Sequence, residues 1–195
     1  MKFLTTAVVA TASIAALSAV GVSAQTQKTY DIKVSKDATI LSPSANCNEC
    51  TLGADQRLEV SSEGGVTSRQ ILLGFTLPSE TIGRPDRLDK CLLELPQPNT
   101  PMTASVTLPI NAASSPFWDE YSVSTNNAPA VGDNIGSITI PNSGKPPLVD
   151  LTAACKAAST SGTGFSIYLE PAVNKHLQFP SKESYTASYL HVTIH

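Results

Sequence analysis

Short stretches in which apolar and polar residues alternate recur along most of this chain. The clearest is 68–77, where every second residue from Ile71 to Leu77 is apolar and points to one face of an extended strand. Leu72 adds an apolar side chain on the opposite face. This pattern predicts a central strand that is covered on both sides.

Weaker runs of the same kind predict further strands. They are 29–41 with a break around Lys36 and Asp37, 57–61, 88–95, 105–110, 135–140, 165–169 and 190–194. In 88–95, Leu88 is out of phase with the apolar residues that follow it, so we expect a bulge after Leu88. Pro109 has no N–H to donate, which predicts that 105–110 is an edge strand.

One stretch, Asp150–Ala158, is typical of a helix instead. It is rich in alanine, Asp150 is suited to cap its first turn, and Gly162 follows its end. About eight or nine short strands, separated by turns rich in proline, glycine and asparagine, predict an all-β fold. We expect a jelly-roll β-sandwich of two antiparallel sheets with one short helix.

The first 24 residues have the pattern of a secretory signal peptide. Lys2 is followed by an apolar run from Ala7 to about Val22, and small residues precede a cleavage point after Ala24. Residues 25–195 then form a single domain. Because no second long apolar run follows, we expect a secreted protein, extracellular or associated with the cell wall, with no membrane as partner.

Charge narrows the choice of partner. The 195 residues carry 13 basic and 16 acidic side chains, a net charge of −3, and they contain no basic block or stripe. We therefore expect no nucleic acid partner. The low charge content and the abundant proline and serine suit an extracellular β domain with long loops, and we expect a monomer.

All four cysteines, Cys47, Cys50, Cys91 and Cys155, lie after the predicted cleavage point. In an oxidising compartment they indicate two disulfides, for which three pairings exist. We favour Cys47–Cys50 within a loop and Cys91–Cys155 across the domain. The Cys47–Cys50 spacing also occurs in redox centres and in half zinc sites, but the sequence lacks the second ligand pair and the α/β pattern that those sites need.

The stretch 117–129 contains the one tryptophan of the chain, Trp118, followed by two acidic residues. In a chain this poor in aromatic residues, a tryptophan is most simply a core anchor. Asn126 and Asn127 are suited to cap a turn through side-chain hydrogen bonds, and Pro129 then ends strand pairing. We interpret the stretch as a corner of the sandwich.

Several motifs follow one another in a fixed order. They are Asp37-Ala-Thr-Ile40, Ser68-Arg-Gln-Ile-Leu-Leu-Gly-Phe75, Leu88-x-x-Cys91-x-Leu93-x-Leu95, Trp118-Asp-Glu120, Asn126-Asn-Ala-Pro129, Asp150-Leu-Thr152 and Phe179-Pro-Ser181-Lys-Glu183. This set resembles the DNRLRE domains, the group that includes carbohydrate-binding module family 96. The resemblance implies an exported jelly-roll domain that binds a polysaccharide, which for some members is alginate.

The resemblance also implies roles for individual residues. Structural motif positions fall on Asn126, Asn127, Pro129, Asp150, Ser181 and Glu183. Cys91 and Cys155 take positions where the family has inward-pointing residues, which implies a buried bridge between them. Lys182 stands where an arginine is usual.

Seven residues are candidates for contact with carbohydrate: Arg57, Arg69, Trp118, Glu120, Tyr168, Lys182 and Tyr189. The three cations suit uronate carboxylates, the indole offers a stacking platform beside an acidic hydroxyl acceptor, and the two tyrosines lie on the polar faces of their strands. Each candidate also has a structural interpretation. The tryptophan is then buried beside a paired Glu120, Lys182 pairs internally with Glu183, and the tyrosines pack against cross-strand neighbours.

No spacing indicates catalysis. His176, His191 and His195 lie near the end of the chain, and a lyase-like set of Tyr189, His191 and Arg69 is conceivable, but nothing in the sequence singles it out. We expect a protein that is not an enzyme.

No cofactor is demanded either. A structural calcium ion is conceivable, with Asp37 as the first candidate ligand and Asp55 or Asp133 as others. The leading hypothesis is a secreted, non-catalytic protein that binds a cell-wall or matrix polysaccharide, with an acidic one such as alginate included. The alternatives are a structural or adhesive wall protein that binds other proteins and, third, a polysaccharide lyase.

Overall fold

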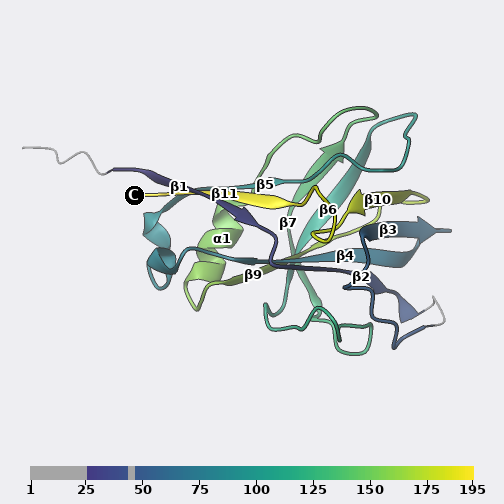
Figure 1. Ribbon diagram of the computed structural model, residues 1–195, viewed down its shortest axis with the longest axis horizontal. Helices are drawn as coiled ribbons and strands as arrows, with labels where there is room; N and C mark the ends of the chain where they lie inside the picture. Colours follow the sequence, from purple (N-terminus) through teal and green to yellow (C-terminus); the bar gives the residue numbers. More distant parts are fainter. Residues whose placement is uncertain (1–25, 44–46) are drawn as a thin grey trace, which may run out of the picture.

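The structure, a computed structural model, describes residues 26–43 and 47–195. The predicted signal peptide, 1–24, lies outside them. Within the described residues eleven strands form two antiparallel sheets, accompanied by one short α-helix. The predicted all-β sandwich is thereby confirmed (Figure 1).

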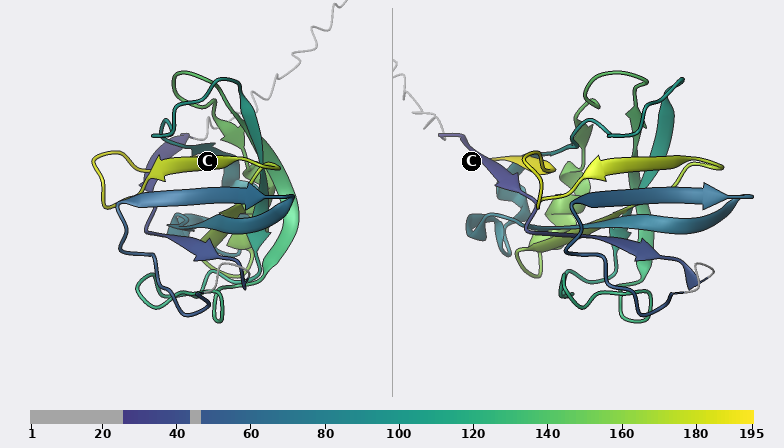
Figure 2. Two further views of the ribbon diagram at one scale, coloured as in Figure 1. Left: turned by 90° about the vertical axis from the view of Figure 1, so that its right-hand side faces the viewer. Right: turned by 45° about the vertical axis from the view of Figure 1, so that its right-hand side comes forward.

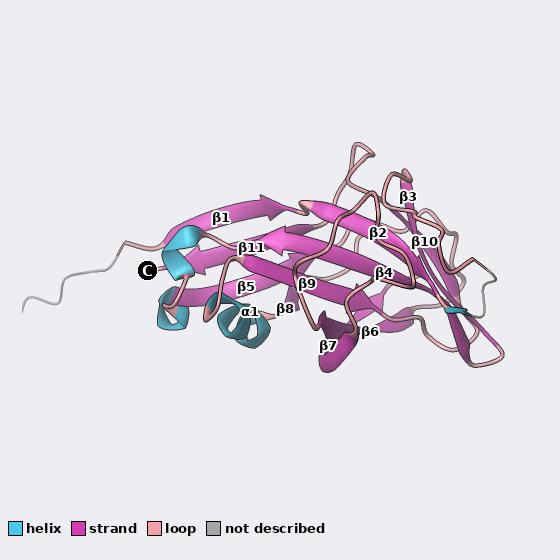
Figure 3. Ribbon diagram, turned by 90° about the horizontal axis from the view of Figure 1, so that it is seen from below, coloured by secondary structure: helices cyan, strands magenta, loops and turns pink. Residues whose placement is uncertain are grey.

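The smaller sheet has four strands in the order β1–β11–β5–β8. Their bounds are Lys28–Lys33 for β1, Leu88–Glu94 for β5, Val149–Asp150 for β8 and Tyr189–Ile194 for β11. Figure 3 shows β1, β11 and β5 side by side. The expected bulge is confirmed, because Thr193 pairs with Lys90 whereas Ile194 pairs with Leu88, which leaves Asp89 as the extra residue.

The larger sheet has the order β10–β3–β4–β9–β6–β7, and β2 also pairs with β4. The bounds are Lys36–Leu41 for β2, Arg57–Glu63 for β3, Val66–Thr76 for β4, Val106–Ala113 for β6, Val131–Ile140 for β7, Gly164–Leu169 for β9 and His176–Pro180 for β10. β4 pairs with β2, β3 and β9. It is the central strand that the apolar pattern predicts.

Apolar side chains from both sheets meet in one main core. Ile71 and Leu73 of β4, Leu93 of β5 and Val192 of β11 are fully buried there. These residues come from alternate positions of their strands, as the period-two pattern requires. None of the helices in the described part of the chain is long and apolar enough to cross a membrane.

Two expectations about the strands are wrong. β6 is not an edge strand, since it lies between β9 and β7. Pro109 is tolerated because it stands opposite Glu170, just beyond the end of β9 at Leu169. The Pro109 carbonyl still accepts the N–H of Glu170 at 3.0 Å, so this pair lacks only the reciprocal bond. The break in the first run falls between β1 and β2, at 34–35, two residues earlier than expected. In addition, the sequence analysis did not predict β8 and β10.

The helix α1 spans Thr152–Ser159, and two 3-10 turns lie at Ser79–Thr81 and Pro85–Arg87. The carboxylate of Asp150 accepts the N–H of Thr152 at 2.8 Å, so it satisfies a donor at the start of α1. Cys155 of α1 is bonded to Cys91 of β5, with Cα atoms 6.4 Å apart, and Cys47 is bonded to Cys50. Both predicted disulfides are confirmed.

Replacing both Cys91 and Cys155 by alanine should lower the free energy of unfolding by about 4 kcal/mol, because their bridge closes a long loop in the unfolded chain. The pair Cys47 and Cys50, only three positions apart, should cost about 2 kcal/mol when replaced in the same way. Urea unfolding of the two double variants beside the wild type checks both values. Equal losses in the two variants would contradict the loop-length argument.

Candidate functional site

A long loop, 114–130, covers the outer face of the larger sheet and lies at the bottom of Figure 1. Its Val123 packs with Leu72 and Tyr168, which are register partners on β4 and β9. Tyr168 is 1% exposed, and its hydroxyl donates a hydrogen bond of 2.6 Å to the Pro129 carbonyl. Burial raises the pKa of Tyr168. The expected exposed stacking surface at Tyr168 is wrong, because the loop covers the face on which it lies.

Trp118 anchors this loop to the sheet. Lys36, Gly74 and Ser166 are neighbours on three adjacent strands, and the half-buried indole lies over Gly74, where a Cβ atom would stand 3.1 Å from its ring. The indole N–H donates to the hydroxyl of Ser166 at 3.0 Å. The ammonium of Lys36 lies 4.4 Å from the ring centroid, within the range of a cation–π contact. The polar and cationic contacts of the indole are thus made within the protein.

Glu120 belongs to a charged cluster in which Asp37 and Glu120 are buried, Lys182 is partly buried and Glu183 is exposed. One Glu120 oxygen accepts the N–H of Asp37 at 2.7 Å, and the other lies 2.9 Å from the ammonium of Lys182. The ammonium of Lys182 also pairs with Glu183, and the backbone N–H of Lys182 donates to the carboxylate of Asp37 at 2.7 Å. Burial opposes the charge on Lys182, but its hydrogen bonds to Glu183 and Glu120 outweigh this and raise its pKa. The cluster therefore ties β2, the 114–130 loop and the segment after β10 together.

Other motif residues fix turns in the same region. The Oδ1 of Asn127 accepts the N–H of Ser124 at 2.7 Å, and its Nδ2 donates to the carbonyl of Ser122 at 3.0 Å. The hydroxyl of Ser181 accepts the N–H of Glu183 at 3.1 Å. These local side-chain bonds replace strand pairing where the chain turns.

Arg57 and Arg69 line one hollow of about 340 Å³ together with Asp55 and Glu59. The Nε of Arg69 lies 3.0 Å from a carboxylate oxygen of Glu59. Lys182 does not line this hollow. The structure thus brings two of the three predicted cations together, but it balances them with two carboxylates.

A larger groove, of about 630 Å³, lies where β5 ends and β11 begins. Its lining comes from the ends of three strands and from three loops: Glu94, Pro96, Gln97, Pro98, Asn99, Lys145, Pro180, Tyr185, Thr186, Ala187 and Tyr189. Figures 1 and 2 show the loops that follow β5 and β7 side by side at the top of the molecule. Of the seven predicted contact residues, Tyr189 is the one that lines this groove.

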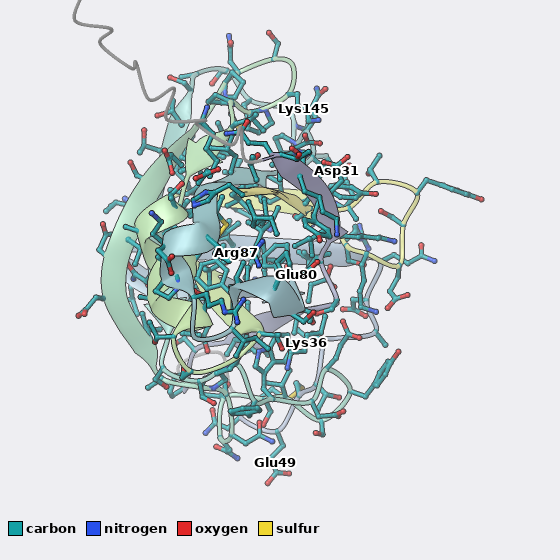
Figure 4. The ribbon with its side chains drawn as sticks, turned by 90° about the vertical axis from the view of Figure 1, so that its left-hand side faces the viewer. Asp31, Lys36, Glu49, Glu80, Arg87 and Lys145 are labelled. Carbon is teal, nitrogen blue, oxygen red and sulfur yellow. A yellow bond between two sulfur atoms is a disulfide. The ribbon has the colours of Figure 1, made fainter. Side chains whose placement is uncertain are left out.

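A row of four alternating charges, Asp31, His191, Glu94 and Lys145, runs across the smaller sheet into the groove. Glu94 pairs with Lys145 through one oxygen, and its other oxygen lies 2.8 Å from Nε2 of His191. Nδ1 of His191 lies 2.7 Å from Asp31. Figure 4 shows Lys145 and Asp31 in the upper part of the view and Lys36 below its centre. We call these four residues the charge row.

Two members of the charge row, Glu94 and His191, have shifted pKa values. The hydrogen bond from Lys145 lowers the pKa of Glu94, so this carboxylate is ionised at neutral pH. Burial disfavours the charged form of His191, but hydrogen bonds to Asp31 and Glu94 outweigh it and raise its pKa. Tyr189 stacks beside His191, with ring centroids 6.5 Å apart and planes 16° from parallel.

Two loops form the walls of the groove. The N–H of Asn99 donates to the carbonyl of Gln178 at 2.8 Å, which fixes the wall after β5 against β10. On the other side, the hydroxyl of Ser184 donates to the carbonyl of Ser181 at 2.7 Å. The next residue, Tyr185, has a fully exposed ring at the rim of the groove.

The groove continues beyond these walls. A second hollow, of about 260 Å³, is lined by 97–102 and 141–144 and shares its first three residues with the groove. The two hollows therefore adjoin along 97–99, beside the loops after β5 and β7. Such a shape suits an extended chain better than a compact small molecule.

The three aspartates considered for calcium lie in different parts of the structure. Asp37 is 1% exposed and its Oδ1 has no hydrogen-bond partner, but it lies in the cluster with the ammonium of Lys182. Asp55 lines the arginine hollow, and Asp133 lines another hollow beside α1. Across 26–43 and 47–195, no three His, Cys, Asp or Glu side chains gather as metal ligands would.

Comparison with known proteins identifies the family to which this chain belongs. The model of carbohydrate-binding module family 96 matches residues 28–194. This chain belongs to that family. The family 96 domain is also 32% identical, over 149 residues, to a protein of Arthroderma benhamiae described as an uncharacterized secreted protein, covering 76% of this chain and 73% of the relative. The wider DNRLRE name stays a prediction.

The sequence analysis did not identify most of the residues that line the groove of this family 96 domain. Tyr185 and Tyr189 stand four positions apart after the last family motif, which is a signal that was available. The proline-rich stretch 96–101 is another. Glu94 and Lys145 carried no signal, because they are 51 positions apart and meet only in the folded chain.

Replacing Lys182 by methionine should lower the free energy of unfolding by about 3–5 kcal/mol, because Glu120 is then left as an unpaired buried charge. Lys182→Arg is the matched control and should retain most of the stability, since a guanidinium can reach two carboxylates. Urea unfolding at pH 7 measures both. A methionine variant as stable as the wild type would show that the cluster contributes nothing.

A second prediction concerns pH. Burial raises the pKa of Asp37 to about 7, although the N–H of Lys182 opposes this rise. The folded state therefore holds this proton more tightly than the unfolded state, so stability from this group is lost as pH rises from about 4 to 7. Asp37→Asn keeps an acceptor for Lys182 and removes the titration.

Between pH 4 and pH 8 the wild type should lose roughly 2–4 kcal/mol of unfolding free energy relative to Asp37→Asn, because only the wild type has a titrating group at this position. Urea unfolding at pH 4, 6 and 8 measures this difference. Parallel pH profiles for the two proteins would refute the raised pKa.

Proposed function

We propose that this family 96 domain is a secreted, non-catalytic protein that holds a polysaccharide chain in the groove lined by the loops after β5 and β7 and by the segment before β11. The observation that carries the proposal is an open groove with two tyrosines and a set of polar groups at one end of a rigid sheet. Family membership supplies the ligand class, and the groove is the surface on which that class fits.

The two tyrosines suit the apolar faces of sugar rings. Tyr189 is held by its strand and by the neighbouring His191 ring, and Tyr185 stands fully exposed at the rim. Aromatic rings offer flat apolar area at little cost in side-chain entropy. The polar groups of Gln97, Asn99 and Lys145 lie around them and suit sugar hydroxyls.

The acid–base chemistry of the groove favours binding over hydrolysis. Among its described lining residues Glu94 is the one carboxylate, whereas glycoside hydrolysis typically needs a pair. Lys145 lowers the pKa of Glu94, which disfavours a role as a general acid.

Export is part of the same proposal. The predicted signal peptide and the description of the relative as a secreted protein both favour it. Two disulfides fit an oxidising compartment. We propose that the protein acts outside the cell, on a cell-wall or matrix polymer.

Replacing Tyr185 and Tyr189 together by alanine should weaken retention on the bound polymer at least about tenfold, because each ring contributes on the order of 1 kcal/mol of contact. Tyr121→Ala is the matched control, since Tyr121 is 65% exposed on the 114–130 loop and does not line the groove. Pull-down on insoluble glucan, chitin and alginate measures retention.

The outcomes separate the hypotheses. Full retention of the double tyrosine variant, or loss in Tyr121→Ala, would place the binding surface elsewhere. No retention of the wild type on any polysaccharide would favour a structural or adhesive role with protein partners. Release of unsaturated ends from the polymer would identify a lyase.

A further inference from the structure

We propose that the groove selects an uncharged polysaccharide and rejects polyuronates such as alginate. This inference rests on the proposed function and adds the class of ligand. It follows from how the charges in and around the groove are paired.

The groove offers no free cation to a uronate carboxylate. Its described lining contains one positive side chain, Lys145, and that ammonium is paired with Glu94. A bound uronate would have to compete with Glu94 for Lys145 while standing close to the Glu94 carboxylate. Like charges that stand close together repel.

The rest of the charge row does not change this balance. Glu94 and Asp31 are negative, Lys145 is positive, and His191 joins them through both ring nitrogens. The row therefore carries no net charge when His191 is protonated and one negative charge when it is neutral. In neither state does the row become a positive surface.

The three cations that were expected to bind uronates lie outside this groove. Lys182 precedes the rim residue Tyr185 by three positions, but its ammonium is held by Glu120 and Glu183. The two arginines that were expected to bind uronates lie in the other hollow, together with Asp55 and Glu59. Uronate binding normally relies on a free bidentate arginine or a local excess of cations.

The groove does offer what a neutral sugar chain needs. Tyr185 and Tyr189 supply apolar rings, and the prolines of the wall after β5 add apolar surface. Gln97 and Asn99 carry amides that can both donate to and accept from hydroxyl groups. Contacts of this kind do not depend on charge, so binding should be insensitive to salt.

The test is a polysaccharide array probed with the mature wild-type protein at 50 mM and 300 mM NaCl. The array carries neutral polymers (laminarin, mixed-linkage β-glucan, mannan, xylan and glycol chitin), the polyuronates alginate and polygalacturonate, and the polycation chitosan. We expect retention on at least one neutral polymer, changed less than twofold by salt and lost in the double tyrosine variant. We expect no retention on either polyuronate.

Binding to a polyuronate or to chitosan in preference to every neutral polymer, with loss at high salt, would overturn the inference and leave the proposed function standing. Binding to no polymer at all would overturn the proposed function, and the inference with it. The two failures are therefore distinct.

A charge variant tests the cause. Glu94→Gln keeps the size of the side chain and leaves Lys145 as an unpaired cation, so the ratio of alginate to neutral-polymer retention should rise at least tenfold at 50 mM NaCl and fall back at 300 mM. Lys145→Gln, which removes the cation instead, should not raise this ratio. An unchanged ratio in Glu94→Gln, with circular dichroism showing a folded protein, would show that charge pairing is not what excludes uronates.

Discussion

The burial of β4 on both faces is the constraint on which the rest of this structure depends. One face, with Ile71 and Leu73, joins the core between the sheets, and the other, with Leu72, needs a separate cover. The loop 114–130 provides that cover, although a loop has few strand pairings to hold it in place. Its position is therefore fixed by side chains, through the indole of Trp118 over Gly74 and through the ion pair of the buried Glu120 with Lys182.

This requirement explains why the family motifs look like a binding site in the sequence. Trp118, Glu120 and Lys182 are chemically suited to sugars, but the structure uses them within the protein, where an aromatic ring and a paired charge hold a loop to a sheet. The segment after β10 connects the two regions. Lys182 anchors it at one end, and Tyr185 reaches the rim of the groove three residues later. The cluster around Lys182 thus contributes indirectly to the position of the segment that carries Tyr185.

Much of the fold was accessible from the sequence, because strand periodicity reports burial directly. The central position of β4, the bulge beside Asp89, the helix after Asp150 and both disulfides were predicted correctly. The prediction that β6 is an edge strand was wrong. Its pairing with β9, which ends opposite Pro109, depends on the tertiary fold and cannot be inferred from a local sequence pattern.

The candidate site was far less accessible, for a related reason. Tyr168 occupies an outward position of its strand, and only the path of a distant loop decides that this position is covered. The apolar Leu72, its register partner, already indicated a covered face, so the two predictions were in conflict within the sequence itself. Lys145, in the loop after β7, and Glu94, at the end of β5, by contrast meet only in the folded chain and could not be paired without the fold.

The division between scaffold and groove also limits what family membership can say about the ligand. The motif residues mostly stabilise the sandwich and its covering loop, whereas the groove is lined largely by the loops after β5 and β7 and by the segment before β11. Residues in such loops can change without disturbing the core, since they carry few of its contacts. Members of one family can then share a fold and a general affinity for polysaccharides while their loops select different polymers. In the selectivity proposed above for this chain, the pairing of Lys145, in the loop after β7, with Glu94, at the end of β5, decides which charge a bound sugar can carry.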